Sequence, residues 1–159
     1  MKNYDLLNHI NNSFKKHMGH YLPTPTPQAN QLEWLDKSAP YSLLAHNTDQ
    51  DPKFVYANSK ALDSFGYSYN EIIDLHSKFS ASEIDRPQRL ILLESVKKNG
   101  IAMNYTGPRV KKDGRFFTIY NGIVWVVEDD TGNEIAQAAL FWKDSAVPDW
   151  FNNVAVKRS

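Results

Sequence analysis

The sequence predicts one α+β domain built on a five-stranded antiparallel sheet. Three observations lead to this class. An amphipathic helix pattern opens the chain, a pair of short strand-like segments follows at 41–57, and the last third consists of long apolar segments separated by tight turns. A chain of 159 residues is long enough to bury one core of this kind.

The N-terminal part, residues 1–40, is predicted to be a helical extension. Over about residues 3–18, apolar side chains recur at helical spacing opposite Asn and Lys. They are Leu6, Leu7, Ile10, Phe14 and Met18. The prolines within 22–27 forbid helix and favour an extended linker. A short helix over about 28–37 follows.

Strand and helix patterns alternate in the middle of the chain. Residues 41–46 and 54–57 indicate two strands joined by a turn-rich segment. Helical segments follow at about 59–66, 69–75 and 85–98. In the last of these, Leu90, Leu93 and Val96 are predicted to face the core, and Gly100 to terminate the helix in the left-handed conformation.

The last third is predicted to form three strands, at 102–111, 115–128 and 134–143, joined by tight turns. Both faces of the long middle strand are apolar. One face is predicted to hold Phe117, Ile119, Ile123, Trp125 and Val127, and the other Phe116, Tyr120, Val124 and Val126. Both faces therefore need a cover. The middle helices are expected on one face and the N-terminal amphipathic helix on the other.

The C-terminal tail, 144–159, carries Trp150 and Phe151 among polar residues. These rings are expected either to dock on the domain or to contact a partner. Both alternatives stay open at the level of sequence.

Composition excludes several classes of function. Acidic and basic residues balance to a net charge of zero, and basic runs are only pairs, so we expect no nucleic-acid partner. The chain has no cysteine, which excludes disulfides, thiolate metal sites and a thiol-linked chromophore. No apolar run is long enough for a signal peptide or a membrane span, so we expect a cytoplasmic protein without membrane contact.

Several motifs occur at a spacing typical of one family. They are Leu44-Ala45-His46-Asn47-Thr48, Phe54-Val55-Tyr56-Ala57-Asn58, Tyr105-Thr106-Gly107-Pro108-Arg109, Gly114-Arg115-Phe116-Phe117 and Gln137-Ala138-Ala139. Residues 41–143 thereby resemble the MEKHLA domain, a PAS-like module, here of the free-standing bacterial type. The resemblance implies a PAS-like fold and a role in sensing or regulation. It does not imply DNA binding, because the homeodomain and zipper that precede this module in plant regulators are absent from this sequence.

Two features of these motifs have local consequences. Pro108 lacks the amide proton that a central strand needs, so we expect an edge position or a bulge there. Asn58 follows the second strand and is expected to cap the next helix.

The candidate site is a cavity between the sheet and the helix at 85–98, holding a small anionic or aromatic molecule. Gln137 lies between two alanines, on a strand that resembles the one in flavin-binding light sensors where a Gln faces the cofactor ring. It either contacts a ligand or bonds within the core. Arg86, Arg89 and Arg109 suit an anion, or else pair with surface carboxylates. The full candidate set is Gln137, Asn121, Trp125, Tyr105, Arg109, Arg89, Arg86, His46 and Tyr56.

Individual members of this set have alternative interpretations. Asn121 marks a bulge beside Gly122 or points a polar group into the cavity. His46 forms an ordinary hydrogen bond rather than ligating haem or a metal. Tyr56 and Tyr105 supply hydroxyls to the cavity or are core rings.

The sequence narrows the cofactor and the function only to broad classes. No metal site is expected, haem is disfavoured because the helix at 85–98 has no His, and non-covalent flavin stays open. No catalytic motif is found, so we expect a non-catalytic sensing module, a homodimer joined through the N-terminal helix. The alternatives are an interaction module without a ligand and a small enzyme on a cone-shaped α+β fold.

Overall fold

The computed structural model describes residues 4–155, with side chains described to residue 152. The N-terminal helices are α1 (Tyr4–Met18) and α2 (Gln31–Lys37), and the strands β1 (Ser42–His46) and β2 (Phe54–Ala57) follow. The middle helices are α3 (Ser59–Phe65), α4 (Tyr69–Ile72), the short 3-10 helix η1 (Ser77–Ser80) and α5 (Arg86–Asn99). The chain continues through β3 (Ile101–Val110), β4 (Phe116–Glu128), β5 (Glu134–Trp142) and α6 (Asp149–Ala155).

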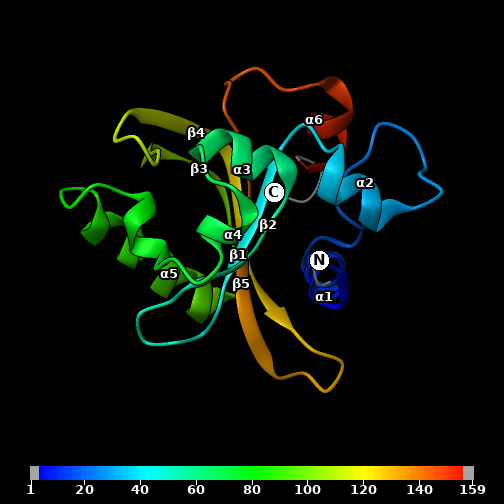
Figure 1. Ribbon diagram of the computed structural model, residues 1–159. Helices are drawn as coiled ribbons and strands as arrows, with labels where there is room; N and C mark the ends of the chain where they lie inside the picture. Colours follow the sequence, from blue (N-terminus) through cyan, green and yellow to red (C-terminus); the bar gives the residue numbers. More distant parts are fainter. Residues whose placement is uncertain (1–3, 156–159) are drawn as a thin grey trace.

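The five strands form one antiparallel sheet with the order β2-β1-β5-β4-β3. Figure 1 shows the sheet nearly edge-on at the centre, with α1, α2 and α6 on one side and α3, α4 and α5 on the other. The predicted α+β fold, with the N-terminal amphipathic helix covering one face, is confirmed. Pro108 lies on β3, an edge strand, as the sequence predicted.

The α1 face of the sheet carries the larger apolar core. Leu7, Ile10 and Phe14 of α1 have no exposed surface and pack on side chains of β1, β4 and β5. The tail adds to this core, because Phe151 of α6 is buried against the rings of Tyr41 and Trp142. Of the two alternatives for the tail, docking on the domain is therefore the one that the structure shows.

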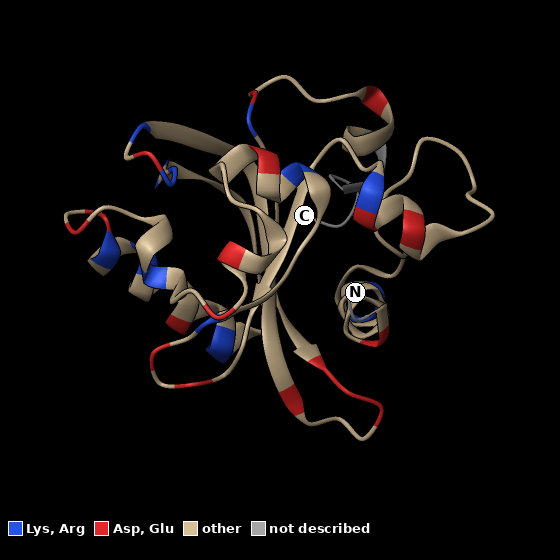
Figure 2. Cartoon of the chain, in the orientation of Figure 1, with Lys and Arg blue, Asp and Glu red and all other residues tan. Residues whose placement is uncertain are grey.

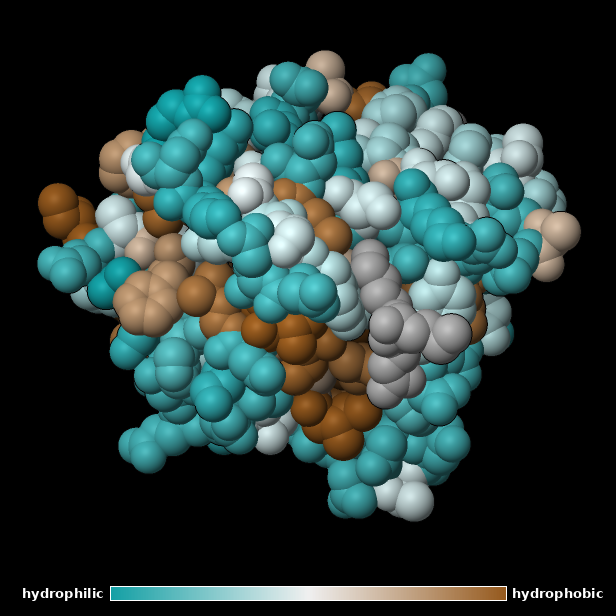
Figure 3. Space-filling view, in the orientation of Figure 1, coloured by the Kyte–Doolittle hydropathy of each residue, from teal (hydrophilic) through white to brown (hydrophobic). Residues whose placement is uncertain are grey.

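The opposite face, covered by α3, α4 and α5, carries a smaller core. Its buried side chains include Phe54 and Phe141 of the sheet, and Ala61, Phe65 and Ile72 of α3 and α4. In Figure 3 the surface is mostly hydrophilic, and brown residues gather where Figure 1 shows the edge of the sheet between the two helical layers.

A bulge in β4 corrects the predicted faces of that strand. Tyr120 pairs with Trp142 and Ile123 pairs with Leu140, so β4 has one more residue than β5 between these pairs. Asn121 is the extra residue of the bulge, and its backbone has a positive φ of 52°. Side chains before and after the bulge consequently change faces. Phe117 and Ile119 join the core under α3, whereas Ile123, Trp125 and Val127 pack under α1.

The predicted orientation of α5 is partly wrong. Val96 is fully buried as expected, and Gly100 ends the helix with a φ of 87°. Leu90, however, is 53 % exposed, and the charged residue Arg89 takes a buried position instead. The helix therefore presents a guanidinium group rather than Leu90 to the sheet.

Asn58 has the structural role that the sequence predicted. Its side-chain oxygen accepts hydrogen bonds from the amides of Ala61 and Leu43, at 2.9 and 3.0 Å. Its amide nitrogen donates to the carbonyls of Leu35 and Tyr41. One buried amide group thus caps α3 and joins it to α2 and β1.

Candidate ligand pocket

A cavity of about 60 Å³ lies between the sheet and α5, where the sequence placed the candidate site. It is bounded by η1 and α5, by the inner face of β1, β4 and β5, and by β3. The polar side chains that line it are His46, Ser80, Arg89, Tyr105, Arg109 and Gln137. The apolar wall includes Phe54, Phe65, Leu92, Ile119 and Phe141.

Arg89 and Arg109 bring two buried positive charges to this cavity. Their exposed fractions are only 5 % and 9 %. Burial, together with the neighbouring Arg109, lowers the pKa of the Arg89 guanidinium to about 10, so the group stays charged at neutral pH. Figure 2 shows Lys and Arg recurring along α5, although Arg89 is buried under the helix.

Neither guanidinium has a carboxylate partner in the part of the chain that the structure describes. None of the ion pairs found there includes Arg89 or Arg109. Arg89 donates to Ser77 Oγ, and Arg109 donates to Tyr105 Oη at 3.2 Å and to the Pro108 carbonyl at 2.7 Å. Buried charges are normally paired, so these two donors face the cavity with unused capacity.

Tyr105 is held beside Arg109 by the small residue between them. Tyr105, Gly107 and Arg109 alternate along β3, and the Tyr105 ring lies over Gly107. A Cβ atom at Gly107 would collide with the Tyr105 hydroxyl and would lie 2.8 Å from ring atom Cζ. Glycine is therefore needed here for the close approach of the ring, which also places Tyr105 within a cation–π distance of Arg109 (5.3 Å).

His46 and Gln137 lie directly opposite each other on β1 and β5. His46 Nδ1 is 2.9 Å from the Asn47 carbonyl, and Gln137 Nε2 donates to the Leu93 carbonyl at 3.4 Å. The other polar atom of each side chain, His46 Nε2 and Gln137 Oε1, is buried and has no partner among the described residues. Two further atoms of this kind, His20 Nε2 and Trp142 Nε1, are not part of the cavity wall.

Five of the nine candidate residues thus line one cavity: Gln137, His46, Tyr105, Arg89 and Arg109. Whether they bind a ligand remains a prediction. The surface pairing considered for the arginines occurs for Arg86, which lies 4.0 Å from Glu83, and not for the other two.

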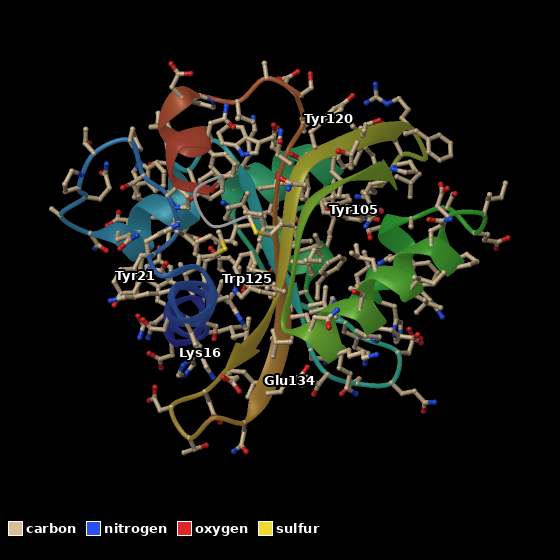
Figure 4. All side chains as sticks on the ribbon, turned by 180° about the vertical axis from the view of Figure 1, so that it is seen from behind. Lys16, Tyr21, Tyr105, Tyr120, Trp125 and Glu134 are labelled. Atoms are coloured by element: carbon tan, nitrogen blue, oxygen red, sulfur yellow. The ribbon has the colours of Figure 1, made fainter. Side chains whose placement is uncertain are left out.

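The placement of the other four candidates in the cavity is wrong. Trp125 lies on the α1 face, because the β4 bulge reverses its direction, and its Nε1 donates to the Ile10 carbonyl at 3.2 Å. Figure 4 shows Trp125 and Tyr105 on opposite sides of the sheet. Tyr56 also faces the α1 side and donates to Asp36 at 2.7 Å.

The side chains of Asn121 and Arg86 instead form hydrogen bonds with backbone carbonyl groups. Asn121 Nδ2 donates to the Ser145 carbonyl, and its positive φ identifies it as the bulge residue. Arg86 Nε donates to the carbonyls of Lys78 and Ala81 and so joins the start of α5 to η1.

The candidate set from the sequence did not include the apolar lining residues or Ser80 of η1. Leu92 of α5 and Ser80 of η1 are examples of lining residues that were not predicted. The weak apolar periodicity of 85–98 was the available signal, since an amphipathic helix that buries Arg89 cannot show a clean apolar stripe.

The MEKHLA domain model matches residues 4–145 of this chain. The chain belongs to the MEKHLA domain family. The match includes α1 and α2, whereas the domain predicted from the sequence spans 41–143; that division of the chain stays a prediction. A search of curated proteins finds no match.

Solved structures of PAS and light-oxygen-voltage domains are similar in fold. A PAS domain from Colwellia psychrerythraea has a TM-score of 0.63 at 12 % identity, over 72 % of this chain and 94 % of that one. An RNA-binding light-oxygen-voltage receptor gives 0.60 at 18 % identity, over 77 % of this chain and 37 % of that one. A light-oxygen-voltage domain studied with a flavin analogue gives 0.59 at 18 % identity, over 77 % and 89 %. The fold is therefore that of PAS domains.

None of the described helices has both the length and the apolar character needed to cross a lipid bilayer.

Proposed function

We propose that this protein is a sensory or regulatory PAS-like module that binds a small anionic molecule in the cavity between the sheet and α5. The family and the fold support a role in signal sensing or regulation, and PAS-like domains are generally not enzymes. The proposal therefore includes binding and no reaction.

The observation that carries the proposal is the pair of buried, unpaired guanidinium groups, Arg89 and Arg109. Two like charges in one small cavity repel each other, and burial removes much of their hydration. Asp51, the carboxylate whose field reaches Arg89, is already engaged with His76 and Lys78. An anion bound between the two arginines would supply the missing negative charge, and their planar forks suit a carboxylate or phosphate.

Size argues against flavin in this cavity. A structurally similar light-oxygen-voltage domain was studied with a flavin analogue. Sites for ligands of that size occupy roughly 300–1,000 Å³, whereas this cavity measures about 60 Å³. Two buried cations and an apolar wall of Phe54, Phe65 and Phe141 leave no room for a tricyclic ring, so the residues present do not fit a flavin.

The test is calorimetry and thermal unfolding with a panel of small anions (acetate, propionate and inorganic phosphate) in a buffer free of other carboxylates and phosphates. An anion at about 100 times its Kd stabilises the folded protein by about 2.7 kcal/mol, which raises Tm by several degrees. We expect Arg109→Met to weaken binding at least roughly tenfold, because a charge-assisted hydrogen bond is lost.

Arg115→Met is the matched control. Arg115 is 74 % exposed at the hairpin between β3 and β4 and pairs with Asp113, so its removal leaves the cavity intact. Equal loss of affinity in both variants would assign the effect to general electrostatics. An unchanged Tm of the wild-type protein with every anion would refute the proposal.

A further inference from the structure

The cavity has a second polar end, formed by His46 and Gln137, that the two arginines do not explain. These residues form a directly opposed pair on adjacent strands, so their side chains lie on the same face of the sheet. One buried atom on each has no partner among the described residues, and both side chains line the cavity. Leaving such an atom without a hydrogen bond is unfavourable, so these two atoms indicate what a ligand must offer.

The hydrogen bonds of the two side chains define the missing partner as a donor. A carbonyl oxygen only accepts, so the contact with the Asn47 carbonyl requires a proton on His46 Nδ1. Burial lowers the pKa of this imidazole to about 4, so the ring is neutral at pH 7 and Nε2 carries a lone pair. Gln137 must likewise turn its NH₂ group to the Leu93 carbonyl, which leaves Oε1 as an acceptor.

The cavity therefore has donors at one end and acceptors at the other. Arg89 and Arg109 offer N–H donors and positive charge, while His46 Nε2 and Gln137 Oε1 can accept hydrogen bonds. None of the described residues lining the cavity is Asp or Glu. A ligand ammonium group would thus add a third positive charge without a balancing carboxylate. A neutral hydroxyl group meets the requirement without this penalty.

We infer that the ligand is a short hydroxycarboxylate, whose carboxylate binds Arg89 and Arg109 and whose hydroxyl groups donate to Gln137 and His46. This inference rests on the proposed function. A cavity of 60 Å³ holds roughly four to six non-hydrogen atoms, at about 10–15 Å³ for each water-sized atom. Propionate, with five non-hydrogen atoms, and lactate, with six, are within this size, whereas glycerate, with seven, exceeds it by one atom. Any additional length would extend past His46 and Gln137 into the adjoining surface groove, which shares these two residues and Leu93.

The experiment compares three acids that differ only in the number of hydroxyl groups: propionate, lactate and glycerate. Calorimetry on the full chain is expected to show affinity rising in that order, by roughly fivefold for each hydroxyl that meets a buried acceptor. Alanine, which replaces the hydroxyl of lactate by an ammonium group, is expected to bind more weakly than lactate.

Two variants test the acceptors separately. Gln137→Leu and His46→Phe each remove one acceptor at similar shape, so each is expected to reduce the preference for glycerate over propionate by roughly fivefold while propionate binding is retained. Thermal unfolding without ligand establishes that each variant is folded. If one variant does not fold, the acid series on the wild-type protein and on the other variant decides the question.

The possible outcomes separate this inference from the proposed function. Graded affinity that the two variants flatten supports the hydroxycarboxylate. Equal affinity for the three acids overturns it while leaving the anion site in place, and water would then be the partner of the two acceptors. Tighter binding of alanine than of lactate also overturns it. Failure of all these acids and of phosphate to bind overturns the proposed function itself.

Discussion

On the α1 face of the sheet, several buried polar groups join structural elements to one another, although His20 Nε2 and Trp142 Nε1 have no partner among the described residues. On the α5 face, the buried polar groups of Arg89, Arg109 and Gln137 line a cavity. Trp125 donates to the backbone of α1, and Ser13 of α1 accepts from the amide of Glu128 at 2.9 Å. Arg89, Arg109 and Gln137 are also buried, yet Gln137 Oε1 has no partner among the described groups and neither guanidinium has a carboxylate partner there. The difference indicates that one face maintains the fold and that the other is available for a ligand.

The helix on the α1 face also buries more side chains than the helix on the α5 face. Six side chains of α1 are buried, including Leu7, Ile10 and Phe14. In α5, which is almost as long, only Arg89 and Val96 are buried. A helix with little buried apolar surface is held less firmly and changes position more readily. This makes α5, rather than α1, the element whose position we expect a ligand to influence.

The largest effect is expected from Trp125→Ala. This ring has no exposed surface, packs edge-on against Phe14 with ring centroids 5.0 Å apart and donates to Ile10. Its removal leaves a large cavity under α1, and we expect a loss of about 3–5 kcal/mol in the free energy of unfolding, measured by urea denaturation.

Phe116→Ala is the control for this prediction. Phe116 is on the same strand but is 65 % exposed, so we expect a change within about 0.5 kcal/mol. Similar losses in the two variants would show that the α1 face is not the main source of stability.

An intermediate effect is expected from pH, through His46. Its pKa is about 4 in the folded protein and 6.5 as a free side chain, mainly because of burial. Between these values the unfolded chain binds a proton that the folded protein does not bind. The free energy of unfolding should therefore fall by roughly 1–3 kcal/mol as pH decreases from 6.5 to 4. Denaturation curves across this range provide the measurement.

His46→Phe should flatten this part of the pH profile. The carboxylates with a lowered pKa (Asp51, Glu71, Asp113 and Asp129) lose their contribution at lower pH, as they protonate below their ordinary values of 3.8 to 4.5. A pH dependence that persists unchanged in the variant would assign the effect to groups other than His46.

The smallest effect on stability is expected from Arg89→Met, although the same change should abolish anion binding. Removing an unpaired buried charge also removes its repulsion with Arg109, which offsets the lost hydrogen bond to Ser77. We expect the free energy of unfolding of the ligand-free protein to stay within about 1 kcal/mol of the wild-type value or to rise.

A large loss of stability in Arg89→Met would contradict this interpretation of the α5 face. It would mean that Arg89 is a structural group with partners inside the chain. Measuring ligand-free unfolding and propionate binding on the same variant separates the two roles.

Local signals in the sequence predicted most of the elements and several of their ends. Asn58 and Gly100 act as the cap and the terminator that their residue types indicated. The strands and the α1 helix lie within a few residues of their predicted bounds. The site was predicted less completely. Five of its residues were named in advance, but Trp125 and Tyr56 were assigned to the wrong face of the sheet.

The errors have one physical origin. Alternation along a strand predicts which residues share a face only while the pairing register is regular, and the extra residue at Asn121 reverses it for every later position of β4. The possible bulge was recognised from Asn121-Gly122, but its effect on Trp125 was not carried through. Charged residues on α5 raise a similar difficulty, because periodicity alone assigns an arginine to solvent.

The sequence by itself determined the order of helices and strands, the amphipathic character of α1 and the absence of any thiol chemistry, because these depend on residues near one another in the chain. Only the tertiary structure decided that Arg89 and Arg109 are buried together, and that His46 and Gln137 face them across a small cavity. Burial and unfilled hydrogen bonds depend on neighbours brought from distant segments, and no local pattern specifies those neighbours.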